Sequence, residues 1–139
     1  MLKRVLSLAV LTALSTNVFA KQPKGVTLEQ IGRFETGVFD ESAAEIVAYD
    51  ADTYSLFVIN ANDKSVDVLD ISDPTTPELS GMIDVSVAIP DSGGVNSVAV
   101  HEGLVAIAVE HDDKQTNGWV AFYSTDGTYL NKVAAGALP

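Results

Sequence analysis

The apolar residues after position 44 fall into short runs, and the runs recur in the same order along two stretches of the chain. The runs of the first stretch lie at 45–49, 56–60, 66–74 and 79–83, and those of the second at 96–100, 104–109, 119–127 and 129–133. Each stretch is a unit of roughly 45 residues, a length typical of propeller blades and solenoid turns. Four short strands per unit predict an all-β fold built from antiparallel blades of a β-propeller.

The second run of each unit is apolar at successive positions, not only at alternate ones. Leu56–Ile59 and Leu104–Val109 therefore predict strands with both faces covered, as in stacked blades. We expect Ile59 and Ile107 to lie in the core. The Asp-Gly pair at 126–127 is a strong indication of a hairpin turn.

A lone strand is expected before the first unit. Leu28–Glu35 alternates apolar and polar residues and carries Ile31 and Phe34. In many propellers one N-terminal strand completes the last blade and so closes the ring. We therefore expect about two blades plus a closing strand over residues 28–139, after a polar lead over residues 21–27.

The first twenty residues have the order of a secretory signal peptide. Lys3 and Arg4 give a positive start, residues 5–14 form a short apolar core, and residues 18–20 (Val-Phe-Ala) offer a cleavage site. The core is shorter than the roughly 20 residues of a transmembrane helix. A buried N-terminal helix is the alternative. We expect residues 1–20 to be removed on export, which leaves no transmembrane segment, and the protein to be periplasmic or extracellular.

The chain is acidic, with 19 Asp and Glu against 8 Lys and Arg and a formal net charge of −11. Loss of the signal, which holds two positive charges and no acid, takes the net charge to −13. Nucleic acids and anionic membranes attract clustered Lys and Arg, so neither is an expected partner. The charge suits a soluble exported protein or one that binds cations.

The cysteine content and the length of the chain limit the possible chemistry and architecture. The chain has no cysteine, which excludes disulfides, thiol chemistry and Cys-based metal sites. Without 20 signal residues, 119 of the 139 residues remain, fewer than three units of roughly 45, whereas closed propellers have at least about four blades. We expect the N-terminal piece of a larger protein. The alternative is a small β domain that assembles with copies of itself.

Three segments resemble one family of secreted bacterial proteins. They are Phe34–Asp50, Val66–Pro74 (Val-Asp-Val-Leu-Asp-Ile-Ser-Asp-Pro) and Gly93–His101 (Gly-Gly-Val-Asn-Ser-Val-Ala-Val-His). Together they are similar to the choice-of-anchor I family, and the second is also similar to the LVIVD repeat. The resemblance covers Ile31–Gly136 and implies an exported propeller-like protein, in a family whose members are several times longer. Members often carry labels such as alkaline phosphatase, but the resemblance supplies no catalytic motif.

The predicted topology gathers acidic loops on one face of the blades. In an up-and-down sheet successive connections alternate ends, so the segments leading into each first strand share a face with the second-to-third loops. These leading segments carry Asp40, Glu41, Glu45, Asp91 and Asn96. Hard oxygen ligands from several loops suit Ca²⁺ or Mg²⁺, and the five residues are a candidate metal site. A solvated acidic rim is the alternative.

A second candidate site on that face is the triplet His111, Asp112 and Asp113. The other histidine, His101, lies in a turn beside Glu102 and is expected at the surface. The sequence has no EF-hand loop, zinc-protease histidine spacing, Gly-x-Ser-x-Gly elbow or phosphate loop. No motif therefore names a reaction.

Three functions follow from these patterns. The first is an exported, non-enzymatic binding or scaffold module that contacts an unknown protein or small ligand through its loop face. The alternative is a divalent-metal-dependent phosphoesterase whose site needs further blades. The third is a purely structural repeat segment.

Overall fold

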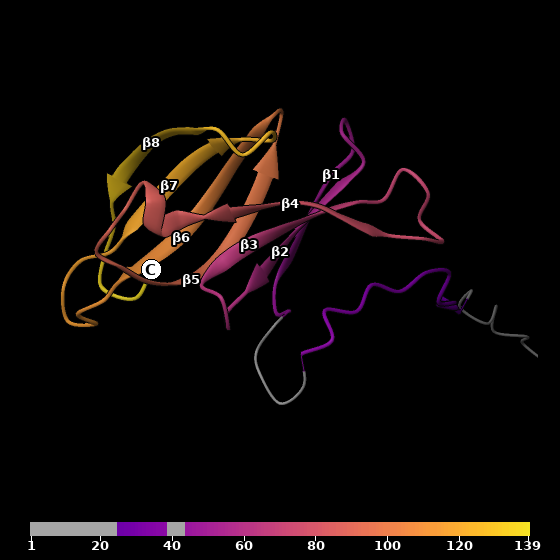
Figure 1. Ribbon diagram of the computed structural model, residues 1–139, viewed down its shortest axis with the longest axis horizontal. Coiled ribbons are helices and arrows are strands. Elements are labelled where there is room, and N and C mark those ends of the chain that lie inside the picture. The colour runs from indigo at the N-terminus through magenta and orange to yellow at the C-terminus, as the bar shows by residue number, and fades with distance from the viewer. Residues whose placement is uncertain (1–24, 39–43) are drawn as a thin grey trace, which may run out of the picture.

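The strands of the protein form two antiparallel sheets (Figure 1). The computed structural model describes residues 25–38 and 44–139, so the predicted signal peptide and the residues Asp40 and Glu41 lie outside the described residues. The strands are β1 (Val47–Asp50), β2 (Ser55–Asn60), β3 (Ser65–Asp70), β4 (Glu78–Asp84), β5 (Ser92–His101), β6 (Leu104–His111), β7 (Trp119–Ser124) and β8 (Tyr129–Ala134). One 3₁₀ turn, η1 (Val85–Val87), joins the sheets.

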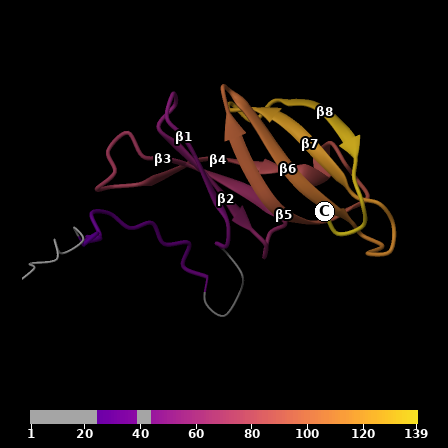
Figure 2. The same cartoon turned by 180° about the vertical axis from the view of Figure 1, so that it is seen from behind.

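Each sheet has its four strands side by side in chain order, β1-β2-β3-β4 and β5-β6-β7-β8. Every predicted run has become a strand, and each predicted unit is one sheet. Figures 1 and 2 show the magenta strands β1–β3 and the orange and yellow strands β5–β8 as two separate sheets. The all-β prediction of two blade-like, four-stranded sheets is confirmed.

The core lies between the two sheets. Phe57, Ile59 and Val66 of the first sheet and Val105, Ile107 and Val109 of the second are 0% exposed and belong to one cluster. The prediction that Ile59 and Ile107 are core residues is confirmed. Burial of these side chains is the main force that holds the sheets together, since each fully buried Val, Ile or Phe contributes roughly 1.5–3 kcal/mol.

Only one face of each sheet is fully covered in the described part of the chain. In β6 the buried residues Val105, Ile107 and Val109 alternate with Ala106 and Ala108, which are half-buried. The prediction of two covered faces therefore holds for one face alone. The reason is that each sheet packs against a single other sheet. We call the two remaining faces the outer faces.

The predicted closing strand over Leu28–Glu35 does not form. Residues 25–38 take no regular secondary structure. A closing strand pairs with the edge of a sheet, whereas Phe34 shares a hollow with Asp67 and Met82 of the first sheet's outer face. Gly32 packs against the backbone of Pro74, where any Cβ would collide with the Pro74 carbonyl oxygen. The segment thus lies on a face and not along an edge.

A buried carboxylate lies beneath this N-terminal segment. Asp67 is 8% exposed, and its Oδ2 accepts a hydrogen bond of 3.2 Å from Asn60 Nδ2. Burial, together with the nearby charge of Asp63, raises the pKa of Asp67 above its usual value, and the Asn60 hydrogen bond only partly opposes this. The ionised form is therefore disfavoured in the folded protein.

We expect the variant Asp67→Asn to melt at a higher temperature than the parent protein at pH 7. A raised folded pKa gives stability that is complete below the unfolded value of about 3.9 and is lost as pH rises through the folded pKa. The substitution removes that loss, because the new amide oxygen can still accept from Asn60. Melting curves from pH 3 to pH 8 should therefore converge at low pH. A variant less stable than the parent at pH 7 would contradict this explanation.

Candidate functional site on the loop face

Each leading segment lies beside the end of the second strand of its own sheet, as the topology predicts. Ahead of β1, the Glu45 N–H donates to the Ile59 carbonyl at 3.1 Å, which places this segment beside the end of β2. Ahead of β5, the Asp91 carbonyl accepts from the Asp112 N–H at 2.9 Å, which ties this segment to the β6–β7 loop. We call this end of the two sheets the loop face.

A hollow of about 380 Å³ opens on the loop face between the two sheets. It is lined by Ala61, Lys64, Gly93, Gly94, Val95, Asn96, Glu110, Asp112 and Lys114. These residues come from the β2–β3 loop, from β5, from β6 and from the β6–β7 loop. We call it the loop-face hollow. Because both sheets contribute to it, the packing of the two units determines its shape.

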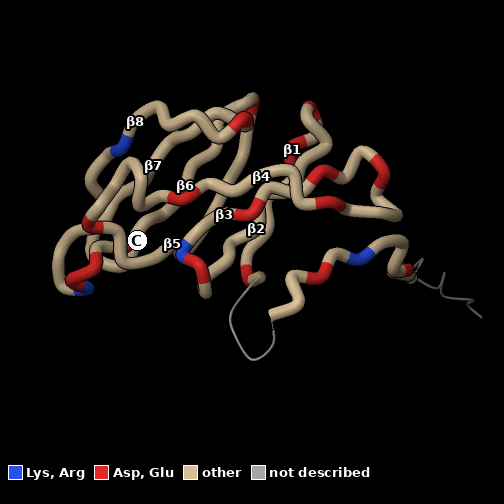
Figure 3. Tube along the Cα trace, in the orientation of Figure 1, with Lys and Arg blue, Asp and Glu red and all other residues tan. Residues whose placement is uncertain are grey.

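The loop-face hollow combines charges of both signs. The described residues contain only four Lys and Arg, at positions 33, 64, 114 and 132, and two of them, Lys64 and Lys114, line this hollow. Lys114 Nζ lies 3.5 Å from Glu110 Oε1. Figure 3 shows how unusual this is, since red acidic positions are spread along both sheets and blue positions are few. The hollow therefore offers ammonium groups beside carboxylates.

Gly93 and Gly94 both line the hollow, but an added side chain would meet different neighbours at the two positions. A Cβ on Gly93 would lie 2.5 Å from the His111 carbonyl oxygen and 3.0 Å from Asp112 Cα, so glycine is needed for the close approach of β5 and the β6–β7 loop. A Cβ on Gly94 would meet only the side chain of Glu110, at 3.2 Å. The ladder shifts register between Ser92 and Gly94, which is a bulge at the rim of the site.

His111 is held by its neighbours at the end of β6. Its ring stacks on Trp119 with centroids 5.3 Å apart, and Lys132 Nζ lies 4.7 Å from the Trp119 centroid. His111 Nδ1 lies 2.6 Å from Asp112 Oδ1, which also accepts from the Asp113 N–H at 2.7 Å. The same N–H lies 2.9 Å from Nδ1. These contacts hold the ring at the end of β6.

Six of the eight predicted site residues are described, and they either line the loop-face hollow, adjoin it or lie away from it. Asn96 and Asp112 line the loop-face hollow, and Asp91 adjoins it through its bond to the Asp112 N–H. Glu45, His111 and Asp113 lie on the loop face but do not line the hollow. Asn96 lies inside β5, not ahead of it, and its Nδ2 donates to the Pro139 carbonyl at 3.1 Å.

Several loop acids stabilise turns. Asp73 Oδ1 accepts from the Thr75 N–H at 2.9 Å, and Asp126 Oδ1 accepts from the Thr128 N–H at 2.9 Å. Side-chain hydrogen bonds, to Thr75 and Ser124 respectively, and these backbone bonds lower the pKa of both carboxyls. Within residues 25–38 and 44–139, no group of three or more His, Asp and Glu is arranged to hold a metal ion.

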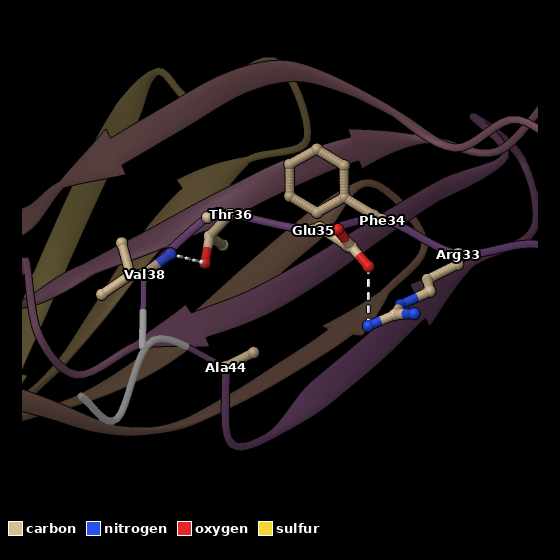
Figure 4. Close-up of a pocket in the computed structure, with 7 residues that line it drawn as sticks. Arg33, Phe34, Glu35, Thr36, Val38 and Ala44 are labelled. Carbon is tan, nitrogen blue, oxygen red and sulfur yellow. Dashed lines mark hydrogen bonds and ion pairs between the residues drawn. The ribbon is translucent and has the colours of Figure 1, made fainter. Parts of the chain in front are cut away.

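A second hollow, of about 250 Å³, lies along the N-terminal segment between Arg33 and Ala44. Figure 4 shows Arg33 paired with Glu35 and the ring of Phe34 projecting from the segment. The ion pair is 2.6 Å long, and its two side chains are 70% and 61% exposed. A pair so exposed contributes little to stability. With a single exposed ion pair and no buried polar group, this hollow is the weaker candidate.

The candidate sites predicted from the sequence do not include Lys64, Glu110 or Lys114, although Lys64 lies in a loop that the predicted topology places on the same face. The search for ligands considered acids and histidines, whereas the distinctive feature of the loop-face hollow is the presence of lysines in an acidic chain. The same topology argument that grouped the acids puts Lys64 in one second-to-third loop and Lys114 in the other. The sequence therefore contained enough information to place Lys64 and Lys114 on the same face.

The family follows from the sequence match. Residues 45–139 match the choice-of-anchor I domain, the stretch that forms both sheets. A comparison with curated proteins finds no match, and neither does a comparison with solved structures. Among the described residues no helix is both long and apolar enough to cross a membrane. With its four-stranded repeats and a match that covers most of its length, this chain belongs to the choice-of-anchor I domain family of exported or cell-surface proteins.

Proposed function

We propose that this protein is a non-enzymatic binding module that contacts a partner protein or a small ligand through the loop-face hollow. The observation that carries the proposal is the placement of Lys64 and Lys114, two of the four described cations, around one hollow that also holds Glu110 and Asp112. Convergent polar groups in a concave site are the usual mark of a ligand site. A ligand that carries both charge signs, such as a short peptide, suits this lining.

The proposal predicts that the two lysines contribute to binding. Fluorescence polarisation with short labelled peptides, graded from acidic to basic, should find its tightest binders among peptides of mixed charge. The double variant Lys64→Ala, Lys114→Ala should weaken that binding by about tenfold or more, since a charged hydrogen bond contributes roughly 1.5–3 kcal/mol. The control Arg33→Ala removes an exposed cation far from the hollow in sequence. An equal loss in the control, or no binder at all, would contradict the proposal.

A divalent cation on the loop face is a separate proposal. It is supported by the acidic segments ahead of β1 and β5, and it requires Asp40 and Glu41 together with Glu45, Asp91 and Asn96, because Ca²⁺ takes 6–8 oxygen ligands. Added Ca²⁺ should then raise the melting temperature by mass action. Glu45→Gln or Asp91→Asn should remove most of that rise, and Asp52→Asn, in the β1–β2 turn, should not. If calorimetry shows the same melting temperature with and without Ca²⁺, the proposal is wrong and these acids form only a solvated rim.

We also propose that residues 1–20 are the export signal and are removed after Ala20. The support is the order of positive start, apolar core and small residues in that segment. Export with cleavage would place the loop face in the periplasm or outside the cell. N-terminal sequencing of the exported protein would contradict this if the chain still began at Met1.

A further inference from the structure

We propose that a hollow beneath the N-terminal segment binds a primary ammonium group on a short apolar stem, the chemistry that a free alkylamine and a lysine side chain share. The hollow, of about 260 Å³, lies between this segment and the outer face of the first sheet. We call it the outer-face hollow. It is a different site from the loop-face hollow, because the two have no lining residue in common.

Two carboxylates lie close together in the lining of the outer-face hollow. Asn60 Nδ2 donates to Asp63 Oδ2 at 3.1 Å and to Asp67 Oδ2 at 3.2 Å. At its other end, Asn60 Oδ1 accepts from the Asp63 N–H at 3.1 Å, which keeps the amide nitrogen turned toward the two acids. One neutral amide group therefore serves both carboxylates, and it brings no positive charge to offset the repulsion between them.

Within residues 25–38 and 44–139, no cation neutralises this pair of acids. Asp67 is 8% exposed, and neither Asp63 nor Asp67 takes part in any of the ion pairs of these residues. The third acid of the lining, Glu35, is already paired with Arg33 at 2.6 Å. A buried charge without a partner of opposite sign costs folding free energy. The site therefore gains stability from a ligand that brings a positive charge.

A buried hydroxyl on the same side of the sheet also has no partner. Ser65 is 0% exposed, and its Oγ makes no hydrogen bond within the described part of the chain. Ser65 lies directly opposite Asn60 in the β2–β3 ladder and two residues before Asp67 in β3, so the three side chains share the outer side of the sheet. Buried polar groups are nearly always hydrogen-bonded. A ligand donor at Asp67 can satisfy this hydroxyl as well.

The remaining walls of the outer-face hollow are largely apolar. Phe34 and Val38 of the N-terminal segment and Leu79 and Met82 of β4 line it. An alkyl stem can pack against such walls, and the face of the Phe34 ring attracts a cation. A volume of about 260 Å³ is smaller than the roughly 300–1,000 Å³ of sites for drug-sized ligands. The hollow therefore suits a ligand about the size of one side chain.

An ammonium group suits this lining better than a metal ion does. Ca²⁺ takes 6–8 oxygen ligands, whereas the acids of the hollow that are free of an ion pair are Asp63 and Asp67 alone. A primary ammonium group has three N–H donors, which the two carboxylates and the Ser65 hydroxyl can accept. Hydrogen bonds between an ammonium group and a carboxylate are about twice as strong as those between neutral groups. The site thus selects for positive charge and N–H donors together.

The first test uses n-butylamine, a primary ammonium group on a short alkyl stem. It is titrated into the isotope-labelled protein at pH 7 and constant ionic strength, and the backbone amide signals are followed by NMR. The largest changes should fall at residues 34–38, 65–67 and 79–82, none of which lines the loop-face hollow. The uncharged 1-butanol should bind at least about tenfold more weakly, because it lacks the charged hydrogen bonds. Equal binding of the two compounds, or changes confined to other residues, would overturn the proposal.

A second titration distinguishes the two sources of the ammonium group. N-acetyl-lysine methylamide presents a lysine side chain on a peptide backbone. If it binds at the same residues as n-butylamine, the ligand is a lysine of a partner chain. If n-butylamine alone binds there, the ligand is a small free amine. If neither compound binds there, the proposal is wrong.

Two variants of β3 show whether the buried acid carries the binding. Asp67→Asn keeps the shape of the side chain but removes its charge, and it should weaken n-butylamine binding by about tenfold or more. The control Asp70→Asn removes an exposed carboxylate from the same strand and should leave the affinity unchanged. Added n-butylamine should raise the melting temperature of the parent and of Asp70→Asn by mass action, and that of Asp67→Asn much less. Equal affinity of Asp67→Asn and the parent would overturn the proposal.

Discussion

Replacing Ile107 by Ala should lower the free energy of unfolding by about 2–5 kcal/mol, the range for removing a large buried aliphatic side chain. Ile107 is 0% exposed and pairs with Val98 on one side and Ala121 on the other, all three in the central cluster. Because both of these partners are held in strands, the space left by the side chain cannot easily close. Urea unfolding followed through the fluorescence of the single tryptophan, Trp119, measures the loss.

The matched control for this experiment is Leu130→Ala. Leu130 is also a large aliphatic residue in a strand, but it is 53% exposed. Exposed substitutions of this kind usually change stability by no more than about 0.5 kcal/mol. If both variants lost the same amount, or if Ile107→Ala lost well under 1 kcal/mol, the second strands of the repeats would not form the core.

Replacing Gly93 by Ala should destabilise the protein by about 1–3 kcal/mol, the usual range for forcing extra atoms into a packed site. The new methyl group would lie 2.5 Å from the His111 carbonyl oxygen and 2.8 Å from the His111 carbonyl carbon. These are backbone atoms, so β5 and the β6–β7 loop must move apart. Since Asp112 and Lys114 line the loop-face hollow from that loop, the variant should also bind mixed-charge peptides more weakly.

The neighbouring glycine provides the control. A methyl group at position 94 would meet the Glu110 side chain, with its nearest atom Oε1 at 3.2 Å, and that side chain can rotate away. Gly94→Ala should therefore change stability little, or raise it slightly through reduced freedom of the unfolded chain. Unfolding curves of the two variants decide the point. A larger loss for Gly94→Ala than for Gly93→Ala would contradict the packing described here.

The strands could be predicted from the sequence because their cause is local. Apolar runs such as Leu56–Ile59 lie between short polar turns, and these repeat at the spacing of hairpins. Glu102 and Gly103, with φ angles of 48° and 79°, form the tight type of turn that joins two neighbouring strands. Two units with the same order of runs then indicate two similar sheets.

The N-terminal segment could not be predicted in this way. Leu28–Glu35 alternates like a strand, but alternation says only that one side of a segment meets apolar groups. It does not distinguish pairing along an edge from lying on a face, as Phe34 does against the outer face of the first sheet. The strand β5 also begins earlier than the predicted run at 96–100. Bulges allow Gly93 and Gly94, which are not apolar positions, to lie within the strand.

The most direct test of the central claim, a binding module that acts through its loop face, is to map a bound ligand by NMR. The tightest mixed-charge peptide is titrated into the isotope-labelled protein, and the backbone amide signals are followed. Binding at the loop-face hollow predicts that the largest changes fall at residues 61–64, 91–96 and 110–114. Changes concentrated instead at the opposite end, at residues 51–54 and 125–128, would contradict the claim.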